Sequence, residues 1–333
     1  GMQAYFDIEN LSSFTKSSAK AQFDDCNRML RGHFDLKFNF TKKDLEEKAK
    51  ENPAILSWLT TMTQGFKGSI SYSQGESFPP RPLKSNTHKS FDLEQLMSIY
   101  LINDPRIAKI KENGCIMYAP IGEEVEVLSS LFKDSDYQFQ KSFELRKMTG
   151  WSDLDGLITP TSDIIIADQY CLSDPNVYEN NIYTLLSVLC QKVNNVMTNI
   201  IIFTQPSNYD RVNKYTFEPD WANIRAAIKR KVKSTTGMEP KVTFVLASDM
   251  GEHDRTVFTN YQYLVPGDTI NLFDSQWRVI SHGRHLGVYS LAHRDHLQAM
   301  RNFIADMQAI IDKIKTRNPE QIKFDKESLF LNF

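Results

Sequence analysis

Three apolar segments in the second half of the chain constrain the fold more than any other feature. Residues 163–168 (DIIIAD) and 199–204 (NIIIFT) are continuous β-branched runs, which are typical of strands buried on both faces of a sheet. A third apolar run, residues 242–247, follows them. Segments with apolar residues at helical spacing, 181–196 and 221–233, separate the three runs. This alternation predicts right-handed crossovers and a mostly parallel sheet.

We therefore expect an α/β protein of two domains. The chain has 333 residues, of which 41% are hydrophobic, so it can bury a substantial core. We place the boundary near residues 150–161. Residues 1–150 then form a smaller α/β or α+β domain of unknown role. In residues 151–333 a mostly parallel or mixed sheet is flanked by helices, and a final helix at 292–315 covers one face.

Charge and cysteine usage limit the class of partner and the compartment. Lys and Arg number 39 against 41 acidic residues, so a nucleic-acid partner would need a local basic patch. The four cysteines are far apart and form no CxxC pair, as in a reduced cytoplasmic protein. No run approaches the roughly 20 apolar residues that span a bilayer, and the amino terminus lacks signal-peptide features, so we expect no membrane insertion.

Local patterns elsewhere predict further elements. In the first half we expect a strand at residues 3–7 that opens into a turn at 8–11. A helix at 42–50 is N-capped by Thr41, and helical periodicity resumes at 91–102. In the second half, residues 269–273 read as a short strand.

Polar residues follow the predicted buried strands. Ligands of open α/β sheets bind beyond the carboxyl ends of the strands, and three groups fall there: Asp168 with Tyr170, the loop 204–208, and residues 249–255. The last group places a histidine, which titrates near neutral pH, beside acidic and cationic side chains. These are the parts for nucleophilic or acid–base chemistry on an anionic group, and we single out Glu252, His253, Asp254 and Arg255.

The spacing around this histidine is HxR followed by four residues and Asn, in HDRTVFTN. It resembles the His-x-Lys motif, followed by four residues and Asp, of the phospholipase D-like superfamily. By this resemblance, His253 takes the position of the nucleophile that accepts the phosphoryl group, and Arg255 that of the phosphate-binding lysine. Asn260 stands where the family has an aspartate. The resemblance covers residues 163–291.

This resemblance implies a protein that binds or cleaves a phosphodiester, most plausibly in nucleic acid. An imidazole can attack phosphorus, and a guanidinium stabilises the developing charge. Arginine in place of lysine and asparagine in place of aspartate favour binding at least as much as turnover. A degenerate module that binds a phosphate-bearing ligand or a protein is therefore an alternative.

Only one such motif is visible, whereas family enzymes bring two face to face. Catalysis would then need a symmetric homodimer that pairs His253 with its mate. The alternative without function is a strand-edge turn in which Asp254 and Arg255 form a surface ion pair and His253 is exposed.

A histidine-rich stretch follows at residues 281–296, with HxxH pairs at 282–285 and 293–296. Imidazole is a common zinc ligand, but arginines inside both pairs would place positive charge beside a cation, so we predict no metal site there. In the phosphodiester interpretation, a second group of donors is formed by Ser281, His282 and Arg284.

The segment YFDIENL places Asp7, Glu9 and Asn10 directly after a short strand. It resembles the opening of the PIN-like nucleases of the NYN group, in which a strand ending in an aspartate is followed by Asn-Leu. The resemblance implies clustered carboxylates that hold a divalent metal, and hence a metal-dependent nuclease. The same residues are also common in turns and N-caps.

The strongest basic cluster lies at residues 225–233, where apolar residues recur at helical spacing. The cations are then the solvated face of an amphipathic helix or, alternatively, a nucleic-acid track. There is no glycine-rich phosphate loop and no GxSxG elbow, and we expect no cofactor in the leading interpretation.

Overall fold

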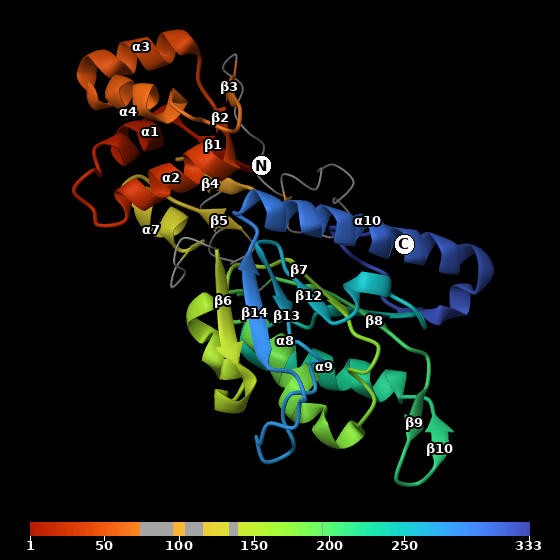
Figure 1. Ribbon diagram of the computed structural model, residues 1–333. Coiled ribbons are helices and arrows are strands. Elements are labelled where there is room, and N and C mark those ends of the chain that lie inside the picture. Colours follow the sequence, from red (N-terminus) through yellow and green to blue (C-terminus); the bar gives the residue numbers. More distant parts are fainter. Residues whose placement is uncertain (74–95, 104–115, 133–138, 195) are drawn as a thin grey trace. The chain divides into compact units, whose positions relative to one another are not determined.

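The computed structural model describes residues 1–73, 96–103, 116–132, 139–194 and 196–333, which form two compact units (Figure 1). Of these, the first unit contains residues 1–73, 96–103, 116–132, 139 and 290–298. The second contains residues 140–194, 196–289 and 299–333. Residues 140–150, which we expected in the first domain, thus lie in the second unit. Each unit combines helices with a sheet, which confirms the α/β class.

The bounds of the elements are as follows. The described helices are α1 (Ile8–Thr15), α2 (Phe23–His33), α3 (Lys42–Glu51), α4 (Ala54–Thr63), α7 (Glu124–Ser129), α8 (Thr184–Leu189), α9 (Trp221–Thr236) and α10 (Arg294–Arg317). The strands of the first unit are β1 (Met2–Phe6), β2 (Phe34–Phe38), β3 (Ile70–Tyr72), β4 (Ile99–Leu101) and β5 (Met117–Tyr118). Those of the second are β6 (Gln140–Glu144), β7 (Asp163–Ala167), β8 (Asn199–Thr204), β9 (Asn208–Asp210), β10 (Tyr215–Phe217), β11 (Lys241–Leu246), β12 (Thr256–Phe258), β13 (Gln262–Val265), β14 (His285–Ser290) and β15 (Ile322–Phe324).

The first unit is built on a parallel sheet with the strand order β3-β2-β1-β4-β5. From β1 the chain adds β2 and β3 on one side, and then β4 and β5 on the other. The order therefore reverses between β1 and β4. In open parallel sheets, the carboxyl ends of the strands at such a reversal flank the crevice in which ligands bind.

Two predictions for the first unit need correction, and one is confirmed. Residues 8–11, expected as a turn, begin α1, because Asp7 is extended and serves as the N-cap of a helix with a buried apolar face. Within the predicted helix 91–102, residues 99–101 form β4, because pairing with β1 and β5 overrides the helical pattern; residues 91–95 lie outside the described residues. The cap of α3 is confirmed: the hydroxyl of Thr41 accepts from Asp44 N at 3.1 Å.

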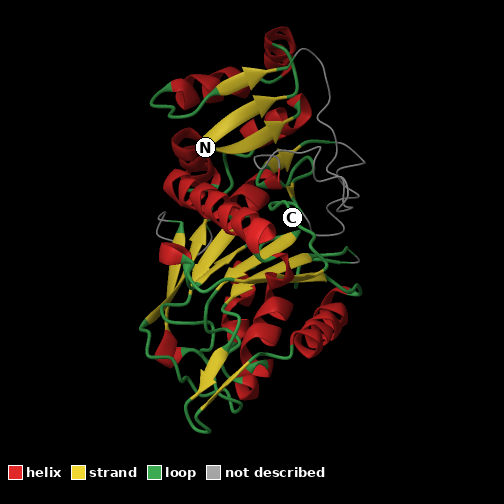
Figure 2. Ribbon diagram, turned by 90° about the vertical axis from the view of Figure 1, so that its right-hand side faces the viewer, coloured by secondary structure: helices red, strands yellow, loops and turns green. Residues whose placement is uncertain are grey.

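The second unit is built on a mixed sheet with the order β15-β11-β8-β7-β12-β13-β14-β6. Strands β7, β8 and β11 are parallel, as predicted, whereas β12 and β15 pair with them antiparallel. Helices α8 and α9 lie on one face and α10 on the other (Figures 1 and 2). Successive side chains of a strand point to opposite faces, so the fully buried run Ile164, Ile165, Ile166 requires this cover on both sides.

Helix α9 forms as predicted in the second unit, whereas the short strand expected at residues 269–273 does not. Helix α9 ends at Gly237, which adopts the left-handed conformation (φ 83°) that glycine reaches without steric cost. Residues 269–273 do not form the expected strand. Instead, the amides of Leu272 and Phe273 donate to Asn181 Oδ1 at 2.9 and 3.1 Å, so a side chain replaces the ladder. Within the part of the chain that is described, no helix has the length and apolarity to cross a membrane.

Candidate functional site

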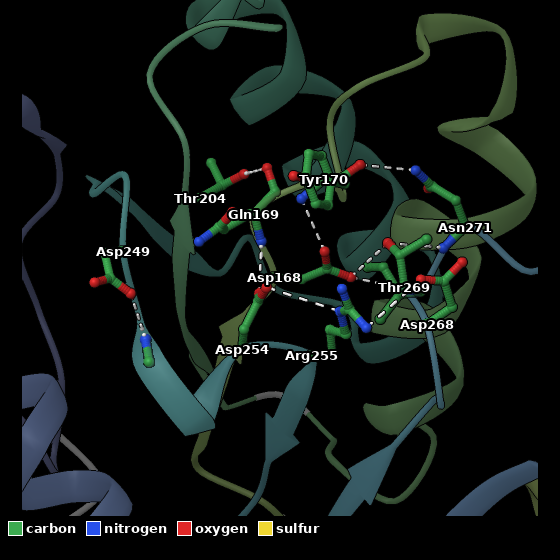
Figure 3. A network of polar contacts seen from close by, with 12 residues as sticks. Asp168, Gln169, Tyr170, Thr204, Asp249, Asp254, Arg255, Asp268, Thr269 and Asn271 are labelled. Carbon is green, nitrogen blue, oxygen red and sulfur yellow. Dashed lines mark hydrogen bonds and ion pairs between the residues drawn. The ribbon is translucent and has the colours of Figure 1, made fainter. Parts of the chain in front are cut away.

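Asp168 follows directly on β7 and is fully buried (Figure 3). Its carboxylate accepts hydrogen bonds from Tyr170 N at 2.9 Å, from Thr269 Oγ1 at 2.7 Å and from Ile270 N at 2.8 Å. Burial raises the pKa of Asp168 to about 6, although these three donors oppose the rise. The side chain thus ties two loops to the end of the central strand and has a positioning role.

The turn that carries Arg255 reaches the same edge of the sheet. Asp254 Oδ1 accepts from Gln169 N at 3.0 Å, which fixes the turn to the residue after Asp168. The guanidinium of Arg255 lies between two carboxylates, 3.8 Å from Asp254 and 3.6 Å from Asp268 (Figure 3). Its buried Nε has no hydrogen-bond partner among the described residues. This Nε is the atom that faces Asp254, so an anionic oxygen could approach only the exposed part of the side chain, which is 39% exposed.

His253 has a different set of neighbours. Its Nε2 hydrogen-bonds to Asp306 on α10 and lies 3.9 Å from Glu252, and its ring meets the edge of Phe303. In the described ranges, Glu252, His253 and Asp306 are the one group of three such side chains whose ligand atoms lie within 4.8 Å of one another. A nitrogen and two carboxylates could hold a divalent transition metal. Both carboxylates are well exposed, however, at 86% for Glu252 and 59% for Asp306.

Asn260 does not join this group. It is fully buried, and its Oδ1 accepts from Thr161 Oγ1 at 3.2 Å and from the amides of Ser162 and Asp163 at 3.1 and 3.3 Å. These groups surround the start of β7. Because β12 runs antiparallel to β7, it carries Asn260 away from the end of β7 that the 252–255 turn reaches. The predicted assembly of His253, Arg255 and Asn260 is therefore not formed, and Asn260 supports the backbone.

The loop 281–284 runs near the partner of Arg255. A Cβ atom added to Gly283 would lie 3.3 Å from Asp268 N, and Ser281 Oγ accepts from Gly283 N at 3.1 Å. The side chains of His282 and Arg284 are exposed. Both could therefore approach an anion bound beside Asp268, as the phosphodiester interpretation requires.

The basic cluster on α9 is largely paired. Arg225 and Lys229 contact Asp325 at 2.7 and 3.1 Å, and Lys231 contacts Glu179 at 2.8 Å. These pairs favour the solvated-face interpretation over the nucleic-acid track.

In the first unit, Asp7 lies at the point where the strand order reverses. It follows β1, and its amide donates to Leu101 O, at the end of β4, at 3.0 Å. Its carboxylate accepts from Asn39 Nδ2 at 3.0 Å and from Asn103 N at 2.9 Å. Residues that follow β1, β2 and β4 thus converge on one carboxylate.

Asn10 and Glu9 differ in their surroundings. Asn10 is fully buried and donates to Ala119 O, just after β5, at 3.1 Å. Its Oδ1, like the buried Oδ1 of Asn39, has no hydrogen-bond partner among the described residues. Glu9 forms a surface ion pair with Lys48 at 2.9 Å. Two of the three residues predicted from YFDIENL therefore lie near the carboxyl edge of the sheet, while the third is engaged by α3.

No protein-family model matches this chain, and no curated protein matches it. Sequence reasoning missed Asn39, Asn103, Asp268 and Asp306. Asn39 directly follows β2 and belongs to no motif that the sequence shows, and Asp306 comes from a helix about fifty residues after His253 with no local motif.

Proposed function

We propose that this protein is a metal-dependent nuclease whose reacting centre is Asp7. The observation that carries the proposal is the position of Asp7, at the carboxyl end of the central strand of a parallel sheet and at the reversal of strand order. Ligands of open α/β sheets bind at this point. The resemblance of YFDIENL to the NYN group agrees with the position, and it implies a divalent cation.

The residues near Asp7 fit an oxygen-preferring cation. Two buried amide oxygens, Asn10 Oδ1 and Asn39 Oδ1, have no hydrogen-bond partner among the described residues. A buried polar atom without a partner is costly, and a cation would offset that cost. Carboxylate and amide oxygens are the protein ligands that Mg²⁺ takes. We therefore assign Asp7 as the principal ligand, with these two oxygens as further ligands, directly or through water.

A cation at this position would polarise a phosphoryl oxygen and lower the pKa of bound water. The residues of the chain supply the geometry. Asn39 and the backbone of Asn103 each bind one oxygen of Asp7, which fixes the plane of the carboxylate. Lys48 lies between Glu9 and Glu51 at 2.9 and 3.0 Å, so its charge is already balanced and does not compete for Asp7.

The test is cleavage of labelled single- and double-stranded RNA and DNA by the purified chain, with Mg²⁺, with Mn²⁺ and with EDTA. We expect cleavage that EDTA abolishes and that Asp7→Asn lowers at least about 100-fold, because a neutral amide binds a cation more weakly than a carboxylate. Glu47→Gln is the matched control, since Glu47 is an exposed carboxylate on α3. Cleavage by Asp7→Asn at the rate of the control would refute the assignment.

We propose as a second candidate that Arg255, with His282 and Arg284 nearby, binds a phosphate group of a ligand. The partly exposed guanidinium of Arg255 favours it, whereas the distance of Asn260 from the turn and the engagement of His253 Nε2 by Asp306 disfavour attack on phosphorus. Metal-independent cleavage that requires His253, in a homodimer, would support the phospholipase D-like alternative instead. Arg255→Ala should weaken phosphate binding, whereas equal affinity would exclude this candidate.

We place this activity in the cytoplasm. Cys26, Cys171 and Cys190 are buried and form no disulfide bond among the described residues, which is typical of a reducing compartment.

A further inference from the structure

A hollow lies in the second unit, just beyond the carboxyl ends of β7 and β8. Its volume is about 1020 Å³, and its walls are the loop 170–176 after β7 and the hairpin formed by β9 and β10. This is large enough for an extended ligand of several groups. None of the residues assigned to the proposed nuclease centre lines it, since that centre belongs to the first unit.

Aromatic rings gather on this hollow. Tyr170, Tyr209 and Tyr215 all line it, and they are 43%, 58% and 51% exposed. Val212, at the turn of the hairpin, is 87% exposed. Single exposed apolar side chains are ordinary, but three tyrosines on one hollow form a surface with several free ring faces. Such faces can stack on other planar groups.

The backbone that carries the rings is fixed before any ligand arrives. Tyr170 N donates to the buried Asp168, and Tyr170 O accepts from Asn271 Nδ2 at 2.8 Å (Figure 3). At the base of the hairpin, Asn208 Nδ2 donates to Leu172 O at 3.3 Å and so joins the two walls. A preorganised surface loses little entropy on binding. This gives the network around Asp168 a purpose beyond stability.

The tip of the hairpin carries two exposed cations that could contact a phosphate. Arg211 and Lys214 are exposed, and neither has an ion pair among the described residues. The carboxylate of Asp210 is occupied within the turn, since it accepts from Val212 N and Asn213 N at 2.9 Å and from Asn213 Nδ2 at 3.0 Å. Arg211 lines the hollow together with the carboxylates of Asp174 and Asp210, and Lys214 lies at the tip of the hairpin, outside that lining.

We propose that this hollow binds single-stranded nucleic acid, with bases stacked on Tyr170, Tyr209 and Tyr215, one phosphate beside Arg211 and the next beside Lys214 at the tip of the hairpin. Stacking platforms interleaved with cations are how proteins hold single strands, whose bases are open to them, whereas a duplex keeps its bases inside. The inference names the substrate class of the proposed nuclease. It rests on the proposed function only in so far as the bound strand is also cleaved. Binding of the strand can be tested without cleavage.

The experiment measures fluorescence anisotropy of a labelled oligouridylate, a labelled oligothymidylate and a labelled duplex of equal length. The full chain carries Asp7→Asn, and EDTA is present, so that no substrate is cleaved. Single strands should bind more tightly than the duplex. Tyr209→Ala and Tyr215→Ala should each weaken single-strand binding roughly tenfold, whereas Tyr209→Phe and Tyr215→Phe should retain it. Arg211→Ala and Lys214→Ala should each lower the salt dependence by about one unit of slope.

Leu56→Ala is the matched control, because Leu56 is 51% exposed and belongs to the first unit. The inference is overturned if Tyr209→Ala and Tyr215→Ala both bind single strands like this control, or if the duplex binds as tightly as the single strands. It is also overturned if no nucleic acid binds, and the occupant of the hollow would then be a protein partner. Cleavage by the unmodified chain separates the two proposals. If the unmodified chain cleaves nucleic acid and the tyrosine variants bind it normally, only this inference is refuted. If binding depends on the tyrosines and the unmodified chain cleaves nothing with any metal, only the proposed nuclease is refuted.

Discussion

Replacement of Asp168 by alanine should destabilise the second unit by about 2–4 kcal/mol. The change leaves the N–H of Ile270, a fully buried residue, without its acceptor, and it frees Tyr170 N and the Thr269 hydroxyl. A buried donor without a partner costs roughly 1–3 kcal/mol, whereas the hydroxyl can rotate to another acceptor. Burial disfavours the charged carboxylate and raises the pKa of Asp168. Its removal therefore offsets part of the lost free energy of unfolding.

The assay is urea unfolding followed by tryptophan fluorescence, with amide hydrogen exchange to locate the loss in residues 163–172 and 269–271. Asp249→Ala is the matched control, since this exposed carboxylate at the same edge accepts only from Gly251 N, at 2.8 Å, among the described residues; it should cost less than about 1 kcal/mol. If Asp168→Ala were no more destabilising than this control, the positioning role of Asp168 would be wrong.

The same carboxylate has a pH signature. Its pKa is about 6 in the folded chain against a usual value of 3.8, so between about pH 4 and pH 6 the folded state binds more protons than the unfolded state. The contribution of Asp168 to stability is therefore present below pH 4 and is lost as the pH rises to 6. Asp168→Asn should remove this part of the slope, while Asp163, whose pKa burial also raises to about 6, retains its own.

Two further predictions concern other parts of the chain. Burial, with the nearby His293, Arg294 and Lys67, lowers the pKa of His33 to about 4. The unfolded state therefore binds more protons than the folded state between pH 6.5 and pH 4. The free energy of unfolding of the first unit should fall by on the order of 1–3 kcal/mol as the pH falls through that window. His33→Gln should flatten that loss in pH-dependent urea unfolding, and an unchanged slope would contradict it. Gly237→Ala should cost about 1 kcal/mol, seen as a lower Tm, because φ is 83° there; an unaltered Tm would show that the helix end adapts.

Much of the second unit could be predicted because its strands are apolar throughout. The runs at 163–168 and 199–204 can be buried only between two layers of helices, and the amphipathic segment at 221–233 has the period of a covering helix. The strand predicted at residues 269–273 does not form, and the reason is physical. The amides of Ile270, Leu272 and Phe273 donate to the side chains of Asp168 and Asn181, and Phe273 forms only an isolated bridge with Val279. No local pattern indicates that a distant side chain will replace a neighbouring strand.

The candidate site of the second unit was predicted only in part. Residues that are a few positions apart on an extended strand lie far apart in space, so they do not meet in one site. Four residues separate Arg255 from Asn260, and a strand advances about 3.4 Å per residue. The motif therefore extends along β7, and its last residue lies toward the opposite end of that strand. His253 instead meets Asp306, whose position depends on how α10 packs. In the first unit, Asp7 and Asn10 could be predicted because the strand and the helix that hold them are adjacent in sequence.

The central claim is that Asp7 holds a divalent cation at the reversal of strand order. The most direct test is a titration of the full chain with Mn²⁺, with bound ion measured by electron paramagnetic resonance and with Glu47→Gln beside Asp7→Asn. We predict one site that the control retains, that Mg²⁺ displaces and that Asp7→Asn loses. Equal Mn²⁺ binding by Asp7→Asn and the control would contradict the account.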